Sequence, residues 1–402
     1  MPDSSATVPP SGPRPLEPGP AAARPASRRT NRPVADAAPA TLDSIQALRG
    51  LAAACVLVYH SGLRLGGEQF PVLAWLTEHV IKRGHVGVDV FFVISGFIIA
   101  WVAVLGRTEP EPALVFSIRR ACRLAPPYWV MSALHAFTLN PVSLAVFAGS
   151  LAFLPVAHEE APYFGYPALY VGWSLNYEMA FYAIFALGLL VARRRALLVV
   201  AAVLGYTTLL LPWWRFGAVD PDPAHLYPFT STWVAMIANP LVLEFALGCA
   251  LAWLYGRARH RFTRGVAIAL LALGVGSFAL SLWLVEPEFS LAGRGLPAGA
   301  LLFGAVAAEH AGLLSVPRSL VWLGELSYAL YLTHPTVIEA VKRLMPELAP
   351  EQMGLQLTRF AIDAALALGL AMLLHRWVEL PAMATGRRLA GRFATRRPRA
   401  GA

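Results

Sequence analysis

Two ionisable residues, Arg49 and His60, lie eleven positions apart (60 minus 49) in the apolar stretch LRGLAAACVLVYH. An α-helix turns about 100° per residue, so both side chains would point within about 20° of one direction, roughly 16 Å apart along the axis. Ionisable residues in membrane helices are costly and usually face the protein interior. The pair therefore predicts a polar track in which Arg49 holds an anion and His60 exchanges a proton. The structural alternative is that Arg49 reaches the lipid headgroups and His60 lies at the membrane interface.

Three arginines follow in the segment SIRRACRLAPPYW, at positions 119, 120 and 123. Spacings of three and four place guanidinium groups on one side of a helix, where they can clamp phosphate oxygens. We therefore expect Arg119, Arg120 and Arg123 to bind the phosphates of a cofactor or cosubstrate. Ordinary positive charge at the cytoplasmic face of a membrane protein is the alternative.

Carboxylates occur inside several apolar segments. Asp89 opens the segment DVFFVISGFIIAW, where it could orient a histidine or a sugar hydroxyl. Glu178 lies in GWSLNYEMAFY and Glu244 in PLVLEFALG. A lone carboxylate in a membrane helix is expected to face the interior. Two roles stay open for Glu178, which are pairing with an arginine and assisting proton transfer.

The composition indicates a protein built mainly from apolar segments. Of its 402 residues, 57% are hydrophobic and 14% charged, whereas a soluble domain carries about a quarter charged residues. Apolar blocks of around 20 residues recur, the length at which an α-helix crosses a hydrocarbon core roughly 30 Å thick. Because lipid offers no hydrogen bonds, blocks this continuous are helices and not alternating barrel strands. The predicted fold class is all-α, a polytopic membrane protein.

The formal net charge of +9 does not indicate nucleic-acid binding. The arginines gather in short clusters between apolar blocks and at both ends of the chain, which is typical of topogenic charge. The cysteines Cys55, Cys122 and Cys249 have no metal-ligand spacing. We expect them to pack as small apolar residues, and we expect no metal site.

About ten apolar segments fit transmembrane helices. They are residues 44–63, 85–105, 121–139, 172–192, 196–213, 232–255, 265–285, 295–314, 320–341 and 356–377. With both termini in the cytoplasm, ten spans leave the arginine clusters inside and the acidic loops outside. An eleventh span at residues 141–156 would invert every later loop, so we expect that segment to be interfacial or re-entrant. The pair Pro126-Pro127 predicts a broken entry into the third span.

The chain divides into one membrane domain and two tails. Residues 1–40 are rich in Pro, Ala and Arg without apolar periodicity, and we expect a disordered cytoplasmic tail. Residues 41–381 form the transmembrane domain. Residues 382–402 are expected to be a basic cytoplasmic tail near anionic headgroups.

Taken in order, these segments resemble the membrane-bound acyltransferase-3 family. The matching elements are Arg-x10-His (Arg49, His60), GVDVFFVISGF (87–97), Arg-x-x-Arg (Arg120, Arg123), WSLNYEMAFY (173–182), LSYALYLTHP (326–335) and WVELP (377–381). The phrasing SIQALRGLAA, NYEMAFY and YLTHP is most similar to the exopolysaccharide O-acyltransferase branch. The chain departs from the pattern at Leu380, where the family usually has an arginine after the glutamate.

The resemblance implies a ten-helix enzyme of the bacterial cytoplasmic membrane. Such an enzyme takes an acyl group from cytoplasmic acyl-CoA, usually acetyl-CoA, to a hydroxyl of a glycan, exopolysaccharide or glycolipid precursor, with no permanently bound cofactor. The family's arginine and histidine functions carry over to Arg49, His60, Arg120 and Arg123. We then expect His60 to be the general base, with a transient acyl-histidine as the variant mechanism. Asp89 or Glu178 would orient or recharge His60.

A secondary transporter is the alternative from another functional class. Arg49, His60 and Glu178 would then line a pathway for substrate and protons. That alternative predicts an inverted repeat, which the sequence does not reveal, and the movement of a substrate without chemical change.

Overall fold

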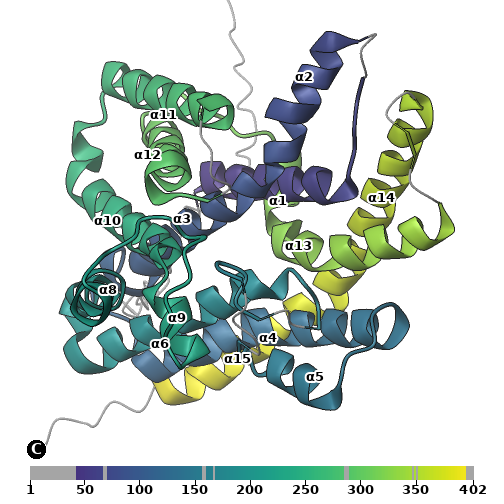
Figure 1. Ribbon diagram of the computed structural model, residues 1–402. Helices are drawn as coiled ribbons and strands as arrows, with labels where there is room; N and C mark the ends of the chain where they lie inside the picture. The colour runs from purple at the N-terminus through teal and green to yellow at the C-terminus, as the bar shows by residue number, and fades with distance from the viewer. Residues whose placement is uncertain are drawn as a thin grey trace, which may run out of the picture. The chain divides into compact units, whose positions relative to one another are not determined.

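The computed structural model describes residues 42–66, 70–155, 160–165, 168–284, 289–345, 348–349 and 352–394, which belong to one unit, residues 38–402. In this part of the chain every regular element is a helix, which confirms the all-α fold (Figure 1). The expected tail at residues 1–40 lies outside the described residues.

The described α-helices follow one another through turns, loops and short 3₁₀ or π segments. They are α1 (Asp43–Ser61), α2 (Pro71–His79), α3 (Gly87–Ala100), α4 (Ala113–Thr138), α5 (Leu144–Leu151), α6 (Gly172–Ala192), α7 (Ala196–Gly205), α8 (Leu211–Phe216), α9 (Thr232–Ala238), α10 (Leu243–Ala258), α11 (Arg264–Leu284), α12 (Leu296–His310), α13 (Arg318–Leu344), α14 (Met353–Leu374) and α15 (Leu380–Ala394).

Six helical stretches of the described chain are long and apolar enough to cross a membrane. They are Pro71–Leu105, Gly172–Phe216, Pro240–Arg261, Arg264–Leu284, Leu291–His310 and Met353–Phe393. The helices α1, α4 and α13 are not among them, although each has 19 residues or more. Their arginines, histidines and other polar residues lower the mean hydropathy of these helices. The count of ten spans and the side of the termini stay predictions.

Two local predictions have different outcomes. Within residues 141–156, α5 has only eight residues and rises about 12 Å, less than half of the hydrocarbon thickness, so it does not span as a single helix. The predicted break at Pro126-Pro127 is wrong, because α4 runs through both prolines from Ala113 to Thr138. Proline removes backbone hydrogen bonds inside a helix, yet α4 continues. Beside the prolines, the Tyr328 hydroxyl donates to the Leu124 carbonyl at 2.7 Å.

Glycines set the distance between α1 and α13, which lie side by side. A Cβ atom on Gly50 would lie 2.9 Å from the Gly324 nitrogen, and one on Gly324 would lie 2.0 Å from the Gln46 carbonyl oxygen. A side chain at either position would therefore push the helices apart. α1 carries Arg49 and His60, and α13 carries His334. The two glycines therefore let these residues lie close to one another.

A carboxylate from another helix caps the start of α1. Leu42 precedes the helix and offers no side-chain cap. Instead, Glu309 of α12 accepts hydrogen bonds from the Asp43 and Ser44 amides, both at 2.9 Å, and from the Ser44 hydroxyl. An anion at a helix N-terminus satisfies free amides and complements the helix dipole. Glu309 thus ties the first turn of α1 to the last turn of α12.

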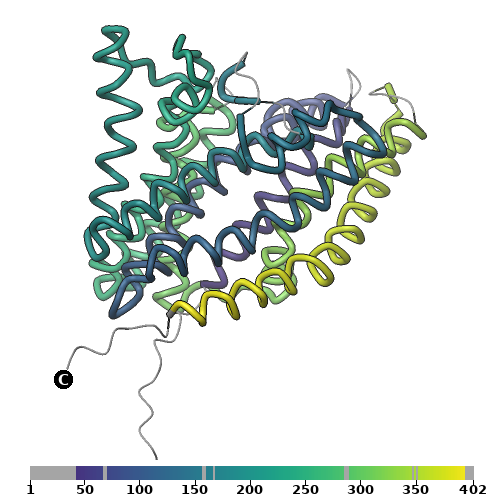
Figure 2. Tube along the Cα trace, turned by 90° about the horizontal axis from the view of Figure 1, so that it is seen from below, coloured from purple at the N-terminus to yellow at the C-terminus, as the bar shows by residue number. Residues whose placement is uncertain are grey.

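The C-terminal basic segment forms a helix as far as Ala394. Figure 2 shows α14 and α15 as one long helical run, joined by the π-helical turn His375–Glu379. α15 packs along α4, where a Cβ on Gly386 would lie 2.7 Å from the Cys122 side chain. Residues 395–402 lie outside the described part.

Candidate active site

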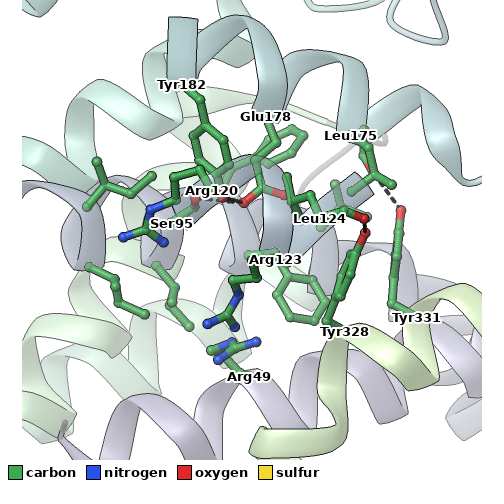
Figure 3. A pocket seen from close by; sticks show the side chains of 17 residues that line it. Arg49, Ser95, Arg120, Arg123, Leu124, Leu175, Glu178, Tyr182, Tyr328 and Tyr331 are labelled. Atoms are coloured by element: carbon green, nitrogen blue, oxygen red, sulfur yellow. Dashed lines mark hydrogen bonds between the residues drawn. The ribbon is translucent and has the colours of Figure 1, made fainter. Parts of the chain in front are cut away.

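Basic and aromatic side chains enclose a cavity of about 100 Å³, which we call the arginine cavity (Figure 3). A cavity of this size holds several water molecules. The polar residues that line it come from α1, α3, α4, α6 and α13: Arg49, Ser95, Arg120, Arg123, Ser174, Glu178, Tyr182, Tyr328 and Tyr331. The helix α4 brings Arg120 and Arg123 there one turn apart, as their spacing predicts.

The arginine cavity has an excess of positive charge. Figure 3 shows the guanidinium groups of Arg49 and Arg123 next to each other, and the charge of Arg123 acts unfavourably on Arg49. The charges of Glu379 and Glu178 partly offset this repulsion. Among the described lining residues, three guanidinium groups face a single carboxylate. An anion with several oxygens would complete this charge arrangement.

Glu178 is held inside the arginine cavity by neighbouring hydroxyl groups. It accepts a hydrogen bond from Ser95 at 3.0 Å and another from the Tyr182 hydroxyl. Arg120 lies over the Tyr182 ring, 5.7 Å from its centroid, and over the Phe116 ring at 5.5 Å. Glu178 thus places its carboxylate in the same cavity as the arginines, and both roles that the sequence left open for it stay predictions.

A second cavity of about 150 Å³, the histidine cavity, adjoins the first. Its lining residues are Tyr59, His60, His85, Val88, Tyr163, Tyr170, Val171, Trp173, Phe289 and Tyr331. Val88 and Tyr331 line both cavities. The single helix α1 thus supplies Arg49 to one cavity and His60 to the other, so the predicted track consists of two adjoining compartments.

Tyr331 marks the boundary between the compartments. Its hydroxyl lies 2.7 Å from the Ser174 hydroxyl and donates to the Val171 carbonyl at 3.2 Å. Ser174 lines the arginine cavity and Val171 the histidine cavity. These bonds hold the tyrosine ring of α13 against the start of α6.

Aromatic rings surround His60 within the histidine cavity. Its ring centroid lies 4.9 Å from Tyr59, edge to face, and 5.4 Å from Tyr170. In the same cavity, the Trp173 ring lies edge to face with the rings of Tyr163 and Phe289, with ring centroids 5.0 and 5.6 Å apart. Burial raises the pKa of the Tyr170 hydroxyl, which lies in the loop before α6, so this hydroxyl stays protonated and can donate a hydrogen bond.

His334 contacts His60 directly, although sequence reasoning assigned it no role. The Nε2 atom of His334 lies 3.2 Å from the Nδ1 atom of His60, with ring centroids 5.0 Å apart. The same His60 Nδ1 lies 3.0 Å from the Val56 carbonyl, and His334 Nδ1 lies 3.1 Å from the Leu330 carbonyl. The signal in the sequence was the histidine of LSYALYLTHP, but only the packing of α13 on α1 reveals its partner.

The structure separates two of the predicted site residues from the cavities. Arg119 forms a 2.6 Å salt bridge with the buried Glu111. Asp89 is fully buried and interacts with Glu244 of α10. Neither Arg119 nor Asp89 is among the described residues that line the two cavities.

Glu379 is a second residue that sequence reasoning underrated. Its carboxylate is buried and lies 2.8 Å from His375 Nδ1, and its charge acts favourably on Arg49. The departure at Leu380 therefore does not leave this carboxylate without a partner. The π-helical turn at residues 375–379 carries both members of the pair.

These observations define a class of protein, a helical membrane protein with a cationic and a histidine-containing cavity side by side. Comparison with known proteins narrows the class. The acyltransferase domain family matches residues 42–376, so the chain belongs to the acyltransferase-3 family. It is a membrane acyltransferase.

Individual relatives cover most of the chain. It is 32% identical over 334 residues to the exopolysaccharide production protein ExoZ of Rhizobium meliloti, covering 79% of this chain and 97% of that protein. It is 31% identical to the acyltransferase MdmB of Streptomyces mycarofaciens, covering 89% of this chain and 94% of that protein. The peptidoglycan O-acetyltransferase OatA of Listeria monocytogenes is 27% identical, with 85% of this chain and 56% of that protein covered. No solved structure matches the chain.

Proposed function

We propose that this protein is an O-acetyltransferase of the bacterial cytoplasmic membrane. It would transfer an acetyl group from cytoplasmic acetyl-CoA to a hydroxyl of a glycan, exopolysaccharide or glycolipid precursor. The observation that carries the proposal is the pair of adjoining cavities, one lined by three arginines and one by His60. Two substrates of different chemistry, one in each cavity, would meet near Val88 and Tyr331, which line both cavities.

The arginine cavity suits the donor. Coenzyme A is polyanionic, and guanidinium groups bind phosphate oxygens through two parallel hydrogen bonds. Arg120 and Arg123 project from α4 and Arg49 from α1, so an anion between them would relieve the repulsion within the cluster. The thioester would then extend toward Tyr331 and the histidine cavity.

The histidine cavity suits the acceptor. A sugar ring has apolar C–H faces and polar hydroxyl edges, and the cavity offers aromatic rings together with the polar groups of His60 and Tyr170. The names of two relatives refer to exopolysaccharide production and to peptidoglycan O-acetylation. They support a glycan as the acceptor.

The chemistry follows from the position of His60. Its ring takes the proton of the acceptor hydroxyl while that oxygen attacks the thioester carbonyl. The carbon–sulfur bond breaks, and the proton passes from His60 to the departing thiolate, giving an ester and free CoA. In the variant mechanism the ring nitrogen of His60 attacks first and carries the acyl group before the hydroxyl accepts it.

The proposal is tested in cells that lack the protein. Mass spectrometry of envelope polysaccharide and lipids should reveal the loss of an acetyl group, restored by the wild-type gene and not by His60→Ala. If the protein were a transporter, its deletion would leave the covalent structure of every glycan unchanged and would alter only where a substrate accumulates. Unchanged acylation in the deletion strain would contradict the proposed function.

A further inference from the structure

We propose that His334 is a positioning residue for His60: it fixes which nitrogen of His60 carries the proton and stabilises the charge that His60 gains. This inference rests on the proposed function, because it concerns how His60 acts as the base. It stands on the hydrogen bonds that join α13 to α1 and on the burial of His334, which is 0% exposed.

The hydrogen bond of His334 to the backbone determines which of its ring nitrogens carries the proton. Its Nδ1 atom lies 3.1 Å from the Leu330 carbonyl oxygen, which can only accept a hydrogen bond. The neutral ring must therefore carry its proton on Nδ1. Its Nε2 atom is left with a lone pair, directed at His60.

The surroundings of His60 determine the position of its proton in the same way. Its Nδ1 atom faces two acceptors, the Val56 carbonyl oxygen at 3.0 Å and the lone pair of His334 Nε2 at 3.2 Å. A lone pair on Nδ1 would be repelled by both, so Nδ1 carries the proton and donates it. In the neutral ring the lone pair then lies on Nε2, which is the atom that can take a proton from a hydroxyl.

His334 also stabilises the charge that His60 gains when it acts as the base. When Nε2 of His60 takes a proton, the ring becomes a cation and its Nδ1–H becomes a charge-assisted donor. His334 Nε2 then accepts a stronger hydrogen bond than in the resting state. The arrangement has the logic of a catalytic triad, in which a buried acceptor orients the imidazole and stabilises the imidazolium. Here a neutral histidine takes the place of the carboxylate.

Kinetics with substituted proteins test the role. His334→Leu removes the acceptor at similar volume, and His334→Gln offers an amide oxygen in its place. The acceptor substrate is the unacylated envelope glycan purified from a strain that lacks the protein. We expect His334→Leu to lower kcat about 10- to 100-fold with the KM for acetyl-CoA unchanged, since hydrogen bonds to charged groups contribute this much. His334→Gln should return kcat to within about threefold of wild type.

A control separates this role from damage to the fold. Thr333 is also buried, and its hydroxyl lies 3.1 Å from the Ala367 carbonyl and 3.3 Å from the Leu330 carbonyl, so Thr333→Val removes a buried hydrogen bond next to His334 while the Leu330 carbonyl and both histidine rings stay in place. The kcat of Thr333→Val should stay near the wild-type value. An equal loss in Thr333→Val and His334→Leu would overturn the inference.

A spectroscopic measurement tests the tautomer without relying on activity or on a stable variant. The ¹⁵N shifts of histidine-labelled wild-type protein distinguish Nδ1–H from Nε2–H rings, and His60→Ala identifies the His60 signals. We expect an Nδ1–H ring at His60; an Nε2–H ring would overturn the inference. Wild-type kcat in His334→Leu, with His60→Ala inactive, would overturn it and leave the proposed function intact. Wild-type kcat in His60→Ala would instead remove the proposed base, and the inference with it.

Discussion

At the residue scale, neighbouring arginines of one motif have different surroundings. Arg120 and Arg123 line the arginine cavity, whereas Arg119 pairs with Glu111. Helical spacing predicted that all three guanidinium groups lie on one side of the helix, and the structure brings only Arg120 and Arg123 to the described cavity lining. Spacing could not predict Glu111 as a partner, because that contact depends on how the loop before α4 folds back.

The different surroundings predict different effects on donor binding. In the double variant Arg120→Ala/Arg123→Ala, the dissociation constant for acetyl-CoA should rise at least about 100-fold, since each of the two lost charge-assisted contacts contributes about 1.5–3 kcal/mol when desolvated. Arg119→Gln removes a charge one residue away and should leave the constant unchanged. Calorimetric titration of each purified variant with acetyl-CoA measures its dissociation constant. Equal affinity in the double variant and the wild type would exclude a phosphate clamp.

At the element scale, the site depends on how closely α1 approaches α13. The pattern of apolar residues predicted both helices, and the motif LSYALYLTHP pointed to α13. The meeting of Gly50 with Gly324 was not predictable from spacing, because a glycine in an apolar segment also occurs where nothing packs against it. Gly369 of α14 is such a case, since a Cβ atom there would have no neighbouring atom within 4 Å.

Gly324→Ala should therefore destabilise the protein and lower its activity. The new Cβ would lie 2.0 Å from the Gln46 carbonyl oxygen, and overpacking of this kind costs about 1–3 kcal/mol. Gly369→Ala is the matched control and should be neutral or stabilising, because alanine favours a helix by about 1 kcal/mol over glycine. Thermal unfolding in detergent compares the variants. A Gly324→Ala protein as stable as the control would contradict the close approach of α1 and α13.

The cap of α1 gives a second prediction at this scale. Glu309→Ala leaves the Asp43 and Ser44 amides without their acceptor, which should cost about 1–2 kcal/mol of stability. Glu339→Ala breaks an exposed ion pair with Arg343 and should cost less than about 1 kcal/mol. The same thermal assay should show a larger loss of stability in Glu309→Ala than in Glu339→Ala. A larger loss in Glu339→Ala would argue against Glu309 as the cap.

At the scale of the whole molecule, contacts between helix ends agree with ten spans. Glu309 at the end of α12 meets the start of α1, and Glu109 of the loop after α3 pairs with Arg194 after α6. Arg343 near the end of α13 donates to the Leu139 carbonyl at the end of α4. A ten-span chain with a cytoplasmic N-terminus places the members of each pair on one side. Composition and charge predicted the all-α membrane fold. Hydropathy alone recovers six stretches, because α1, α4 and α13 are too polar and because residues 172–216, which hold two predicted spans, form one stretch.

The topology predicts which loops an impermeant reagent reaches. A cysteine introduced at Arg194 should be protected in intact cells, and one at Asp222, in the loop before α9, should be labelled by a membrane-impermeant maleimide. Both introduced cysteines should react with the maleimide after the cells are permeabilised. Labelling of position 194 in intact cells would contradict the ten-span arrangement.

The proposed role of His60 as the base that drives the transfer is tested most directly by a single comparison. Purified wild-type protein and His60→Ala, in lipid nanodiscs, receive radiolabelled acetyl-CoA and the unacylated glycan, and the acetylated glycan is counted over time. General base catalysis contributes about 10²- to 10⁴-fold, so His60→Ala should lose at least about 100-fold in rate while it binds acetyl-CoA as tightly as the wild type. Transfer by His60→Ala at the wild-type rate would contradict this role.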